Sequence, residues 1–156
     1  MSKNLILNKA FSPLATISDV KGAIATVTDV AAISDLRKRV EAARKYDSQT
    51  SERRNYWGEL AIWSERRIGE LLIESKADGT IGGAGRPRQE TNTVTLTELL
   101  GTETESQADY INRRSSRLAS HSVEAVEEAI ESILQAIQAA GYSVGLVGQV
   151  MERSSG

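Results

Sequence analysis

The chain has 156 residues, no cysteine and one histidine, and its formal net charge is −2. The lack of cysteine excludes disulfides and thiolate metal sites, and a single histidine argues against a histidine-based metal site. No apolar run approaches the ~20 residues of a membrane span, so we expect a cytoplasmic protein that uses no cofactor, no metal and no membrane.

The charge is divided unevenly along the chain. Residues 1–90 hold 15 Lys and Arg against 12 Asp and Glu, whereas residues 91–156 hold 4 against 9. If a nucleic acid binds, the first part of the chain supplies most of the electrostatic attraction.

Helical patterns follow one another over residues 18–78. A short helix is expected over 19–27, after a Ser18 cap, and a longer one over 28–46, where apolar residues recur every three or four positions. The strongest helix covers 51–76, with Ser51 as its cap. Residues 47–50 contain no strong breaker, so the last two helices either continue as one coiled-coil rod or fold back as an antiparallel hairpin.

The helix over 51–76 is too apolar on one side to stand alone. Tryptophans at this spacing are typical of a core or a dimer interface rather than of a base-stacking site. We predict that this side joins two copies of the chain through the following residues: Tyr56, Trp57, Leu60, Trp63, Ile68 and Leu71. Glu65, Arg66, Arg67 and Glu70 are expected to form surface ion pairs.

A glycine-rich break over 78–92 separates two predicted regions, a long-helix scaffold at 1–78 and a C-terminal region at 93–156, with a linker at 79–92. Within the break, Arg86 and Arg88 flank a Gly-Arg-Pro run that is similar to the core of an AT-hook, although Ala84 stands where that motif has its leading arginine. The two arginines could lie in a narrow minor groove, or the segment could be a solvated linker.

The C-terminal region begins with a helix-turn-helix spacing over 95–119. Thr95 is expected to cap a short helix that Gly101 ends, and Thr104 with Gln107 forms a capping box for a second helix. If the second helix enters the major groove, its DNA contacts would be Asn112, Arg113, Arg114 and Arg117. Three acidic residues near its start oppose this, and the alternative is an ordinary helical hairpin.

A final clear helix is predicted over 123–140, capped by Ser122 and followed by an ambiguous closing segment at 142–151. No strand-like alternation of any length appears, so the fold class is all-α. No phosphate-binding loop is present, and His121 alone indicates a structural role, so we expect no enzymatic activity.

Several runs together resemble a group of uncharacterised phage and mobile-element proteins: SDLRKRVEAARKY, SERRIGELL, GGAGRP, TVTLTELLG and LASHSVEAVEEAI, within residues 18–135. The resemblance implies a phage or prophage context and a DNA-binding role. We therefore predict a dimeric DNA-binding regulator. The alternatives are a module that binds a host protein and a helical virion or assembly protein.

Overall fold

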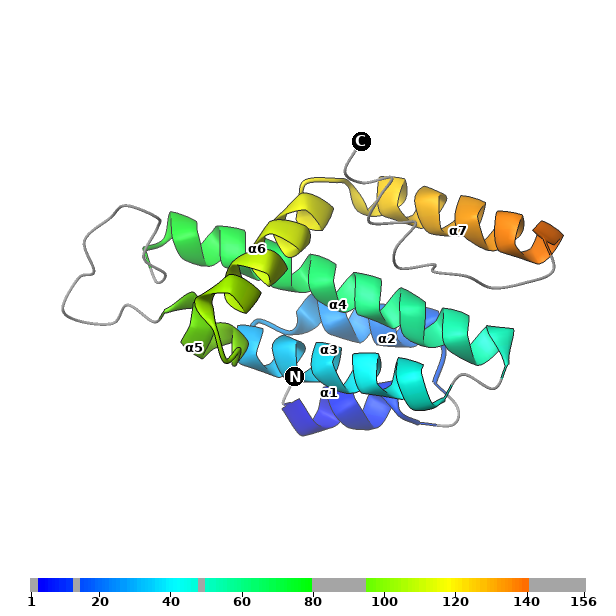
Figure 1. Cartoon of the computed structure of the whole chain (residues 1–156), viewed down its shortest axis with the longest axis horizontal. Helices are drawn as coiled ribbons and strands as arrows, with labels where there is room; N and C mark the ends of the chain where they lie inside the picture. The colour runs from blue at the N-terminus through cyan, green and yellow to red at the C-terminus, as the bar shows by residue number, and fades with distance from the viewer. Residues whose placement is uncertain (1–2, 13–14, 48–49, 80–94, 141–156) are drawn as a thin grey trace.

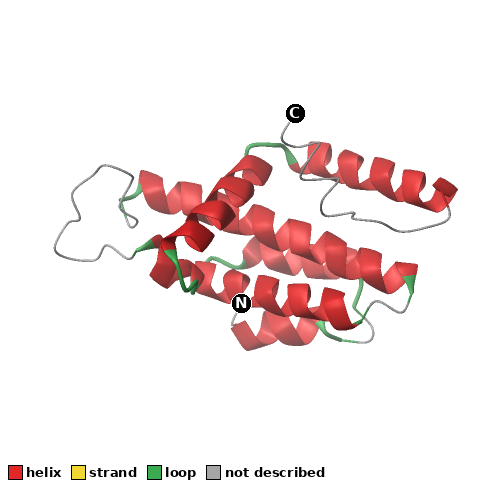
Figure 2. Cartoon of the chain, viewed as in Figure 1, coloured by secondary structure: helices red, strands yellow, loops and turns green. Residues whose placement is uncertain are grey.

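The computed structural model describes residues 3–12, 15–47, 50–79 and 95–140. These residues form α-helices joined by turns, with no strand among them, which confirms the all-α fold class (Figures 1 and 2). The helices are α1 (Lys3–Ala10), α2 (Ile17–Thr26), α3 (Val30–Tyr46), α4 (Ser51–Ala77), α5 (Leu96–Leu100), α6 (Glu105–Ala119) and α7 (Val123–Ala140).

Short hydroxyl and carboxyl side chains begin most of these helices. Asp29 and Thr50 have extended backbones, and each side-chain oxygen accepts a backbone N–H of the first helical turn. Thr16 caps α2 in the same way. The predicted caps Ser18 and Ser51 are wrong by one or two positions, because the threonine before each one makes the bond.

The helices α3 and α4 form an antiparallel hairpin, which resolves the choice between a rod and a hairpin. The helix α3 ends at Tyr46, the chain turns, and α4 returns alongside it (Figure 1). The helix α4 packs most extensively against α3 and α6, and also against α2. It is therefore the central element of the fold.

The predicted interface side of α4 is the core of its own chain. Trp57 is only 2% exposed and Trp63 only 4%. Leu60, Ile68 and Leu71 are also buried. The prediction that these five side chains join two copies is wrong for this fold, since α2, α3 and α6 already cover them. Tyr56, the sixth predicted residue, is half-buried, and its hydroxyl donates to the backbone carbonyl of Ala10 at 2.7 Å.

A carboxylate, Asp47, links α3 to α4 at the end of the hairpin where the two helices are connected. The Trp57 indole N–H donates to an Asp47 carboxylate oxygen at 3.0 Å, and Arg53 donates to the same oxygen at 2.8 Å. The hydrogen bond from Trp57, and then the one from Arg53, lower the pKa of Asp47 below its ordinary value of 3.8.

This contact predicts a pH dependence. Because the folded-state pKa of Asp47 is lowered, its contribution to stability is present above the unfolded value and is lost as pH falls through the folded value. Between about pH 5 and pH 2, the wild type should lose more unfolding free energy than Asp47→Asn, which keeps an acceptor oxygen but does not titrate. Urea unfolding at several pH values measures this, and parallel curves for the two proteins would contradict it.

The helices on both sides of the predicted linker share one hydrophobic core, which includes Leu100, Ala108, Ile111 and Leu118 beside the α4 residues. Residues 80–92 of the predicted linker, with Arg86 and Arg88, lie outside the described residues, as does the predicted closing segment at 142–151.

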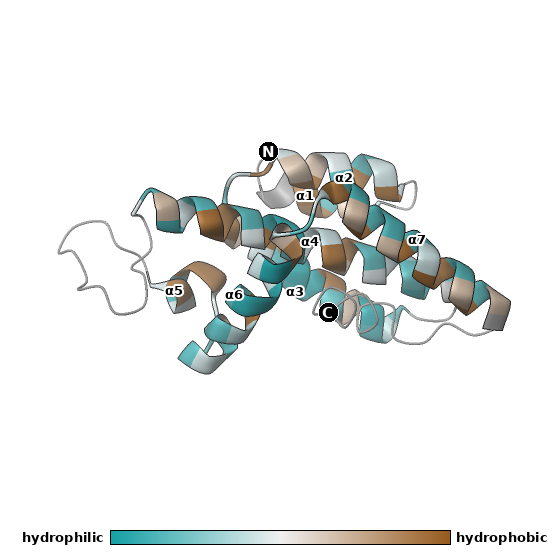
Figure 3. Cartoon of the chain, turned by 90° about the horizontal axis from the view of Figure 1, so that it is seen from above, coloured by the Kyte–Doolittle hydropathy of each residue, from teal (hydrophilic) through white to brown (hydrophobic). Residues whose placement is uncertain are grey.

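The helix α7 is capped by Ser122, as predicted, through a hydrogen bond from the backbone N–H of Ala125. Its apolar and polar residues alternate in bands (Figure 3). Val126, Ile130, Ile133 and Ile137 are buried, and Glu127, on the side of α7 that faces α2, forms an ion pair with Lys21. None of the described helices combines the length and the apolar character needed to cross a membrane.

Candidate nucleic-acid interface

The helix pair α5–α6 begins, turns and restarts where the sequence predicts. The Thr95 hydroxyl caps α5, and Gly101 ends it with a φ of +63°, a conformation that favours glycine. The Thr102 N–H donates back to the Thr97 carbonyl at 3.2 Å, as expected where an α-helix ends at a residue with left-handed backbone conformation. The Thr104 hydroxyl then accepts from the Gln107 N–H and starts α6.

Two side chains of α3 hold the end of α5. The buried Ser34 hydroxyl donates to the Leu100 carbonyl at 2.7 Å, and the Lys38 ammonium donates to the Gly101 carbonyl at 2.7 Å. Carbonyls at a helix C-terminus have no partner within the helix. These two hydrogen bonds therefore give both carbonyls a partner and fix the turn to α3.

Ser34→Ala should lower the unfolding free energy by about 1 kcal/mol, because it leaves the Leu100 carbonyl without its buried donor. Urea unfolding measures the loss. Ser64→Ala is the matched control. Ser64 is also buried, but among the described residues its hydroxyl bonds to the Leu60 carbonyl of its own helix, so the loss should be close to zero. Equal losses in both variants would contradict a specific role for Ser34.

The helix α6 crosses α4 at a glycine. A Cβ atom built on Gly69 would lie 1.9 Å from the Ser115 backbone oxygen and 2.9 Å from the Ala119 Cβ. The two backbones are thus in direct contact, and only glycine leaves room for it. Ser115 is itself fully buried.

A buried carboxylate lies beside this crossing. Glu65 of α4 is 1% exposed, and one of its oxygens accepts from the Arg37 side chain at 2.8 Å. Its other oxygen is 3.2 Å from an Arg114 nitrogen, within ion-pair distance but without hydrogen-bond alignment. The prediction that Glu65 belongs to a surface ion pair is wrong, because α3 and α6 close over it.

Arg114 is therefore not free to contact DNA, contrary to the prediction. Its guanidinium lies against Glu65, donates to the Tyr110 hydroxyl at 3.0 Å and stacks over the Tyr110 ring. Asn112 is engaged as well, since its side-chain oxygen accepts from Lys76 at 2.9 Å and from Ser116 at 3.3 Å. Both residues fasten α6 to the rest of the fold or to itself.

Arg66 and Arg67 hold neighbouring turns. Arg66 donates to the His121 carbonyl at 2.8 Å, and Arg67 donates to the Val27 carbonyl at 2.9 Å. Both arginines also lie within ion-pair distance of Glu70. The ERRIGEL segment thus holds neighbouring turns of the chain in place, and the His121 backbone carbonyl is one of the groups that it binds.

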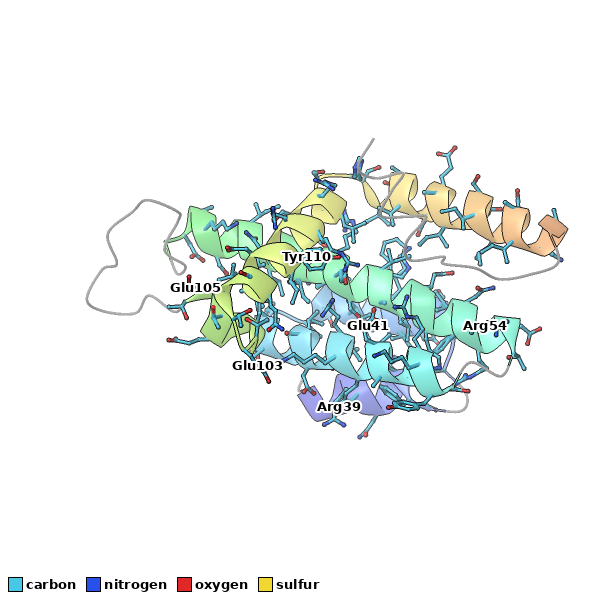
Figure 4. All side chains as sticks on the ribbon, viewed as in Figure 1. Arg39, Glu41, Arg54, Glu103, Glu105 and Tyr110 are labelled. Carbon is cyan, nitrogen blue, oxygen red and sulfur yellow. The ribbon has the colours of Figure 1, made fainter. Side chains whose placement is uncertain are left out.

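Arg113 and Arg117 are exposed on α6, as a groove-contacting pair requires. None of the described residues pairs with the Arg113 guanidinium. Tyr110 is also exposed, one turn before Arg113 (Figure 4). Sequence reasoning missed Tyr110. Its spacing of three from Arg113 and seven from Arg117 is the signal that places all three on one face.

The other end of α6 carries the opposite charge. Glu103, Glu105 and Asp109 are exposed at or near its start, and Figure 4 shows the first two at the α5–α6 turn, away from Tyr110. The helix therefore has an acidic N-terminal half and a basic C-terminal half on its accessible surface.

The chain matches no protein-family model, no curated protein and no solved structure. Within the described ranges, no three His, Cys, Asp or Glu side chains are grouped so that they could hold a metal ion.

Proposed function

We propose that this chain is a non-enzymatic DNA-binding protein whose helix α6 contacts the phosphate backbone through its C-terminal half. The observation that carries the proposal is the pair Arg113 and Arg117, exposed four residues apart on a helix that is fastened at several points. Four residues span ~6 Å along a helix, so both guanidinium groups can reach one DNA strand.

The supports of α6 favour this reading. The Gly69 contact, the Glu65–Arg114 ion pair and the Lys76–Asn112 hydrogen bond leave Arg113 and Arg117 as the exposed basic groups of the helix. Side chains on a fixed helix lose less conformational entropy on binding than side chains on a loop.

The acidic half sets the orientation. Phosphates would repel Glu105 and Asp109, so the start of α6 must point away from the duplex. This differs from a recognition helix that reads bases with its N-terminal residues. We therefore expect affinity that depends strongly on salt and weakly on sequence.

The resemblance to phage and mobile-element proteins supports a role in regulation within such an element. The α4 side chains predicted as a dimer interface form the core of the chain, so they are not available to join two copies. Arg86 and Arg88 remain candidates for a second contact.

Arg113→Ala should weaken binding to a 20-base-pair duplex several-fold and reduce the slope of log affinity against log salt by about 0.9. Fluorescence anisotropy at salt concentrations from about 20 to about 200 mM measures both the affinity and the slope. The slope changes because one fewer counterion is released when one phosphate contact is lost.

Arg39→Ala is the matched control, since Arg39 is an exposed arginine on α3, outside the proposed interface (Figure 4). It should leave the slope unchanged. If the wild type does not bind duplex at the lowest salt, or if both variants change the slope equally, α6 is not the interface.

The second candidate function is a module that binds a host protein. The observation that favours it is the outer face of α7, where Glu124, Glu128 and Glu131 are exposed. Such a face repels DNA and suits a basic protein surface. The same anisotropy experiment separates the candidates, because this one expects no duplex binding at low salt.

A further inference from the structure

A groove runs between α1 and α3, on elements that the DNA-binding proposal does not use. Its volume is about 420 Å³, within the range of ligand-binding pockets. It is lined by Leu7, Asn8, Phe11, Arg39, Ala42, Ala43 and Tyr46. The lining is mostly apolar, with one cation.

Two aromatic side chains of this groove are left unusually open. Tyr46 is 86% exposed and Phe11 is 43% exposed. The Phe11 ring lies 4.9 Å from the Trp57 ring, so the core holds this wall in place. The Tyr46 hydroxyl has no hydrogen-bond partner among the described residues. A packed aromatic ring, Phe11, beside an exposed one, Tyr46, is typical of an interaction surface.

The two helices that form the groove are basic. Together α1 and α3 contain seven Lys and Arg but only two Asp and Glu. Of the two acids, Asp35 is within ion-pair distance of Arg39 and Glu41 of Arg44. Arg37 is also paired, with Glu65 of α4, so the positive charge on these two helices that remains without a carboxylate among the described residues belongs to their lysines. Arg39 is the cation at the groove itself, and its side chain is 59% exposed beside Asp35. The lysine excess favours an acidic partner.

We propose that the α1–α3 groove binds a segment of a partner protein that carries apolar side chains flanked by carboxylates. The apolar side chains would fill the space between Phe11 and Tyr46, and a carboxylate would pair with Arg39. Helix-in-groove recognition uses this combination of apolar anchors and flanking charge.

Other occupants fit less well. A second copy of this chain offers the acidic face of α7, but the apolar residues of that helix are buried in its own core. A nucleic acid would meet the charge of Arg39 but would leave the apolar lining unfilled. An acidic, apolar peptide satisfies both features of the groove.

The test is a selection of random 15-residue peptides displayed against the immobilised full chain, followed by anisotropy with the best binder. The selected sequences should combine aromatic or aliphatic residues with Asp or Glu. Tyr46→Ser and Arg39→Glu should each weaken the best binder at least tenfold, a loss expected at the centre of an interface.

Tyr110→Ser and Arg113→Glu make the same two changes on α6 and serve as controls. They should leave peptide affinity within about twofold and weaken only duplex binding. The groove is not the site if no peptide is enriched, if the enriched peptides are basic, or if the groove variants bind as the wild type does. Sedimentation that shows self-association lost in Tyr46→Ser would assign the groove to a second copy instead.

Discussion

Gly69→Ala should lower the unfolding free energy by about 3 kcal/mol, although alanine is the better helix former. The added methyl would lie 1.9 Å from the Ser115 carbonyl oxygen and 2.4 Å from its carbon. Both are backbone atoms and cannot move by changing a rotamer. The helices α4 and α6 must therefore separate, which loosens the packing of every side chain between them.

Gly22→Ala is the matched control for this substitution. Gly22 lies inside α2, and a Cβ atom there would have no neighbour within 4 Å. That variant should be more stable than the wild type by about 0.5–1 kcal/mol, because alanine loses less entropy on entering a helix. Urea unfolding of both variants measures the contrast. If Gly69→Ala were also stabilising, α6 would not cross α4 at this point.

Backbone signals in the sequence predicted several helix ends, although the caps of α2 and α4 were misplaced and α1 was not predicted. Thr95, Gly101 and Thr104 set the ends of α5 and α6 where their side chains or conformational freedom require, because capping is a local interaction. Asp29 and Ser122 did the same for α3 and α7. These signals involve residues within a few positions of each other, which is why one sequence reveals them.

The partners of each helix could not be predicted in this way. The spacing of Trp57 and Trp63 showed that one side of α4 must be buried, but it did not show whether a second copy or the same chain buries it. The prediction of a dimer interface chose the wrong alternative. Gly69 was the overlooked signal, since a glycine inside a strong helix often marks a close approach of two backbones.

The burial of charged residues also could not be predicted from spacing along one helix. Glu65 and Arg114 each lie among other charged side chains, a pattern typical of solvated helix faces. Their burial depends on the arrival of α6 from beyond residue 94. Asn112, which the same spacing placed in a DNA groove, is likewise engaged by Lys76 of α4. Arg113 and Arg117 are exposed, as predicted, because they lie on the side of α6 away from its buried residues Ala108, Ile111, Ser115 and Leu118.

Glu65→Gln should lower the unfolding free energy by about 3–5 kcal/mol, the cost of leaving buried cations without their counter-charge. The side chain of Arg37 is 15% exposed and that of Arg114 is 22% exposed, so water only partly compensates them. Glutamine has nearly the same shape as glutamate, so the loss reports on charge rather than on packing. Chemical denaturation at constant salt measures it.

Glu41→Gln is the control, because Glu41 is also paired with an arginine at 2.8 Å but both partners are accessible to water. It should change the unfolding free energy by less than about 0.5 kcal/mol. A triple variant provides a second test and carries Glu65→Met, Arg37→Met and Arg114→Leu together. Since an apolar set of similar volume removes the unpaired charges, this triple variant should regain most of the stability. A triple variant no more stable than Glu65→Gln would show that packing at the α4–α6 crossing, and not the buried charge, determines the loss.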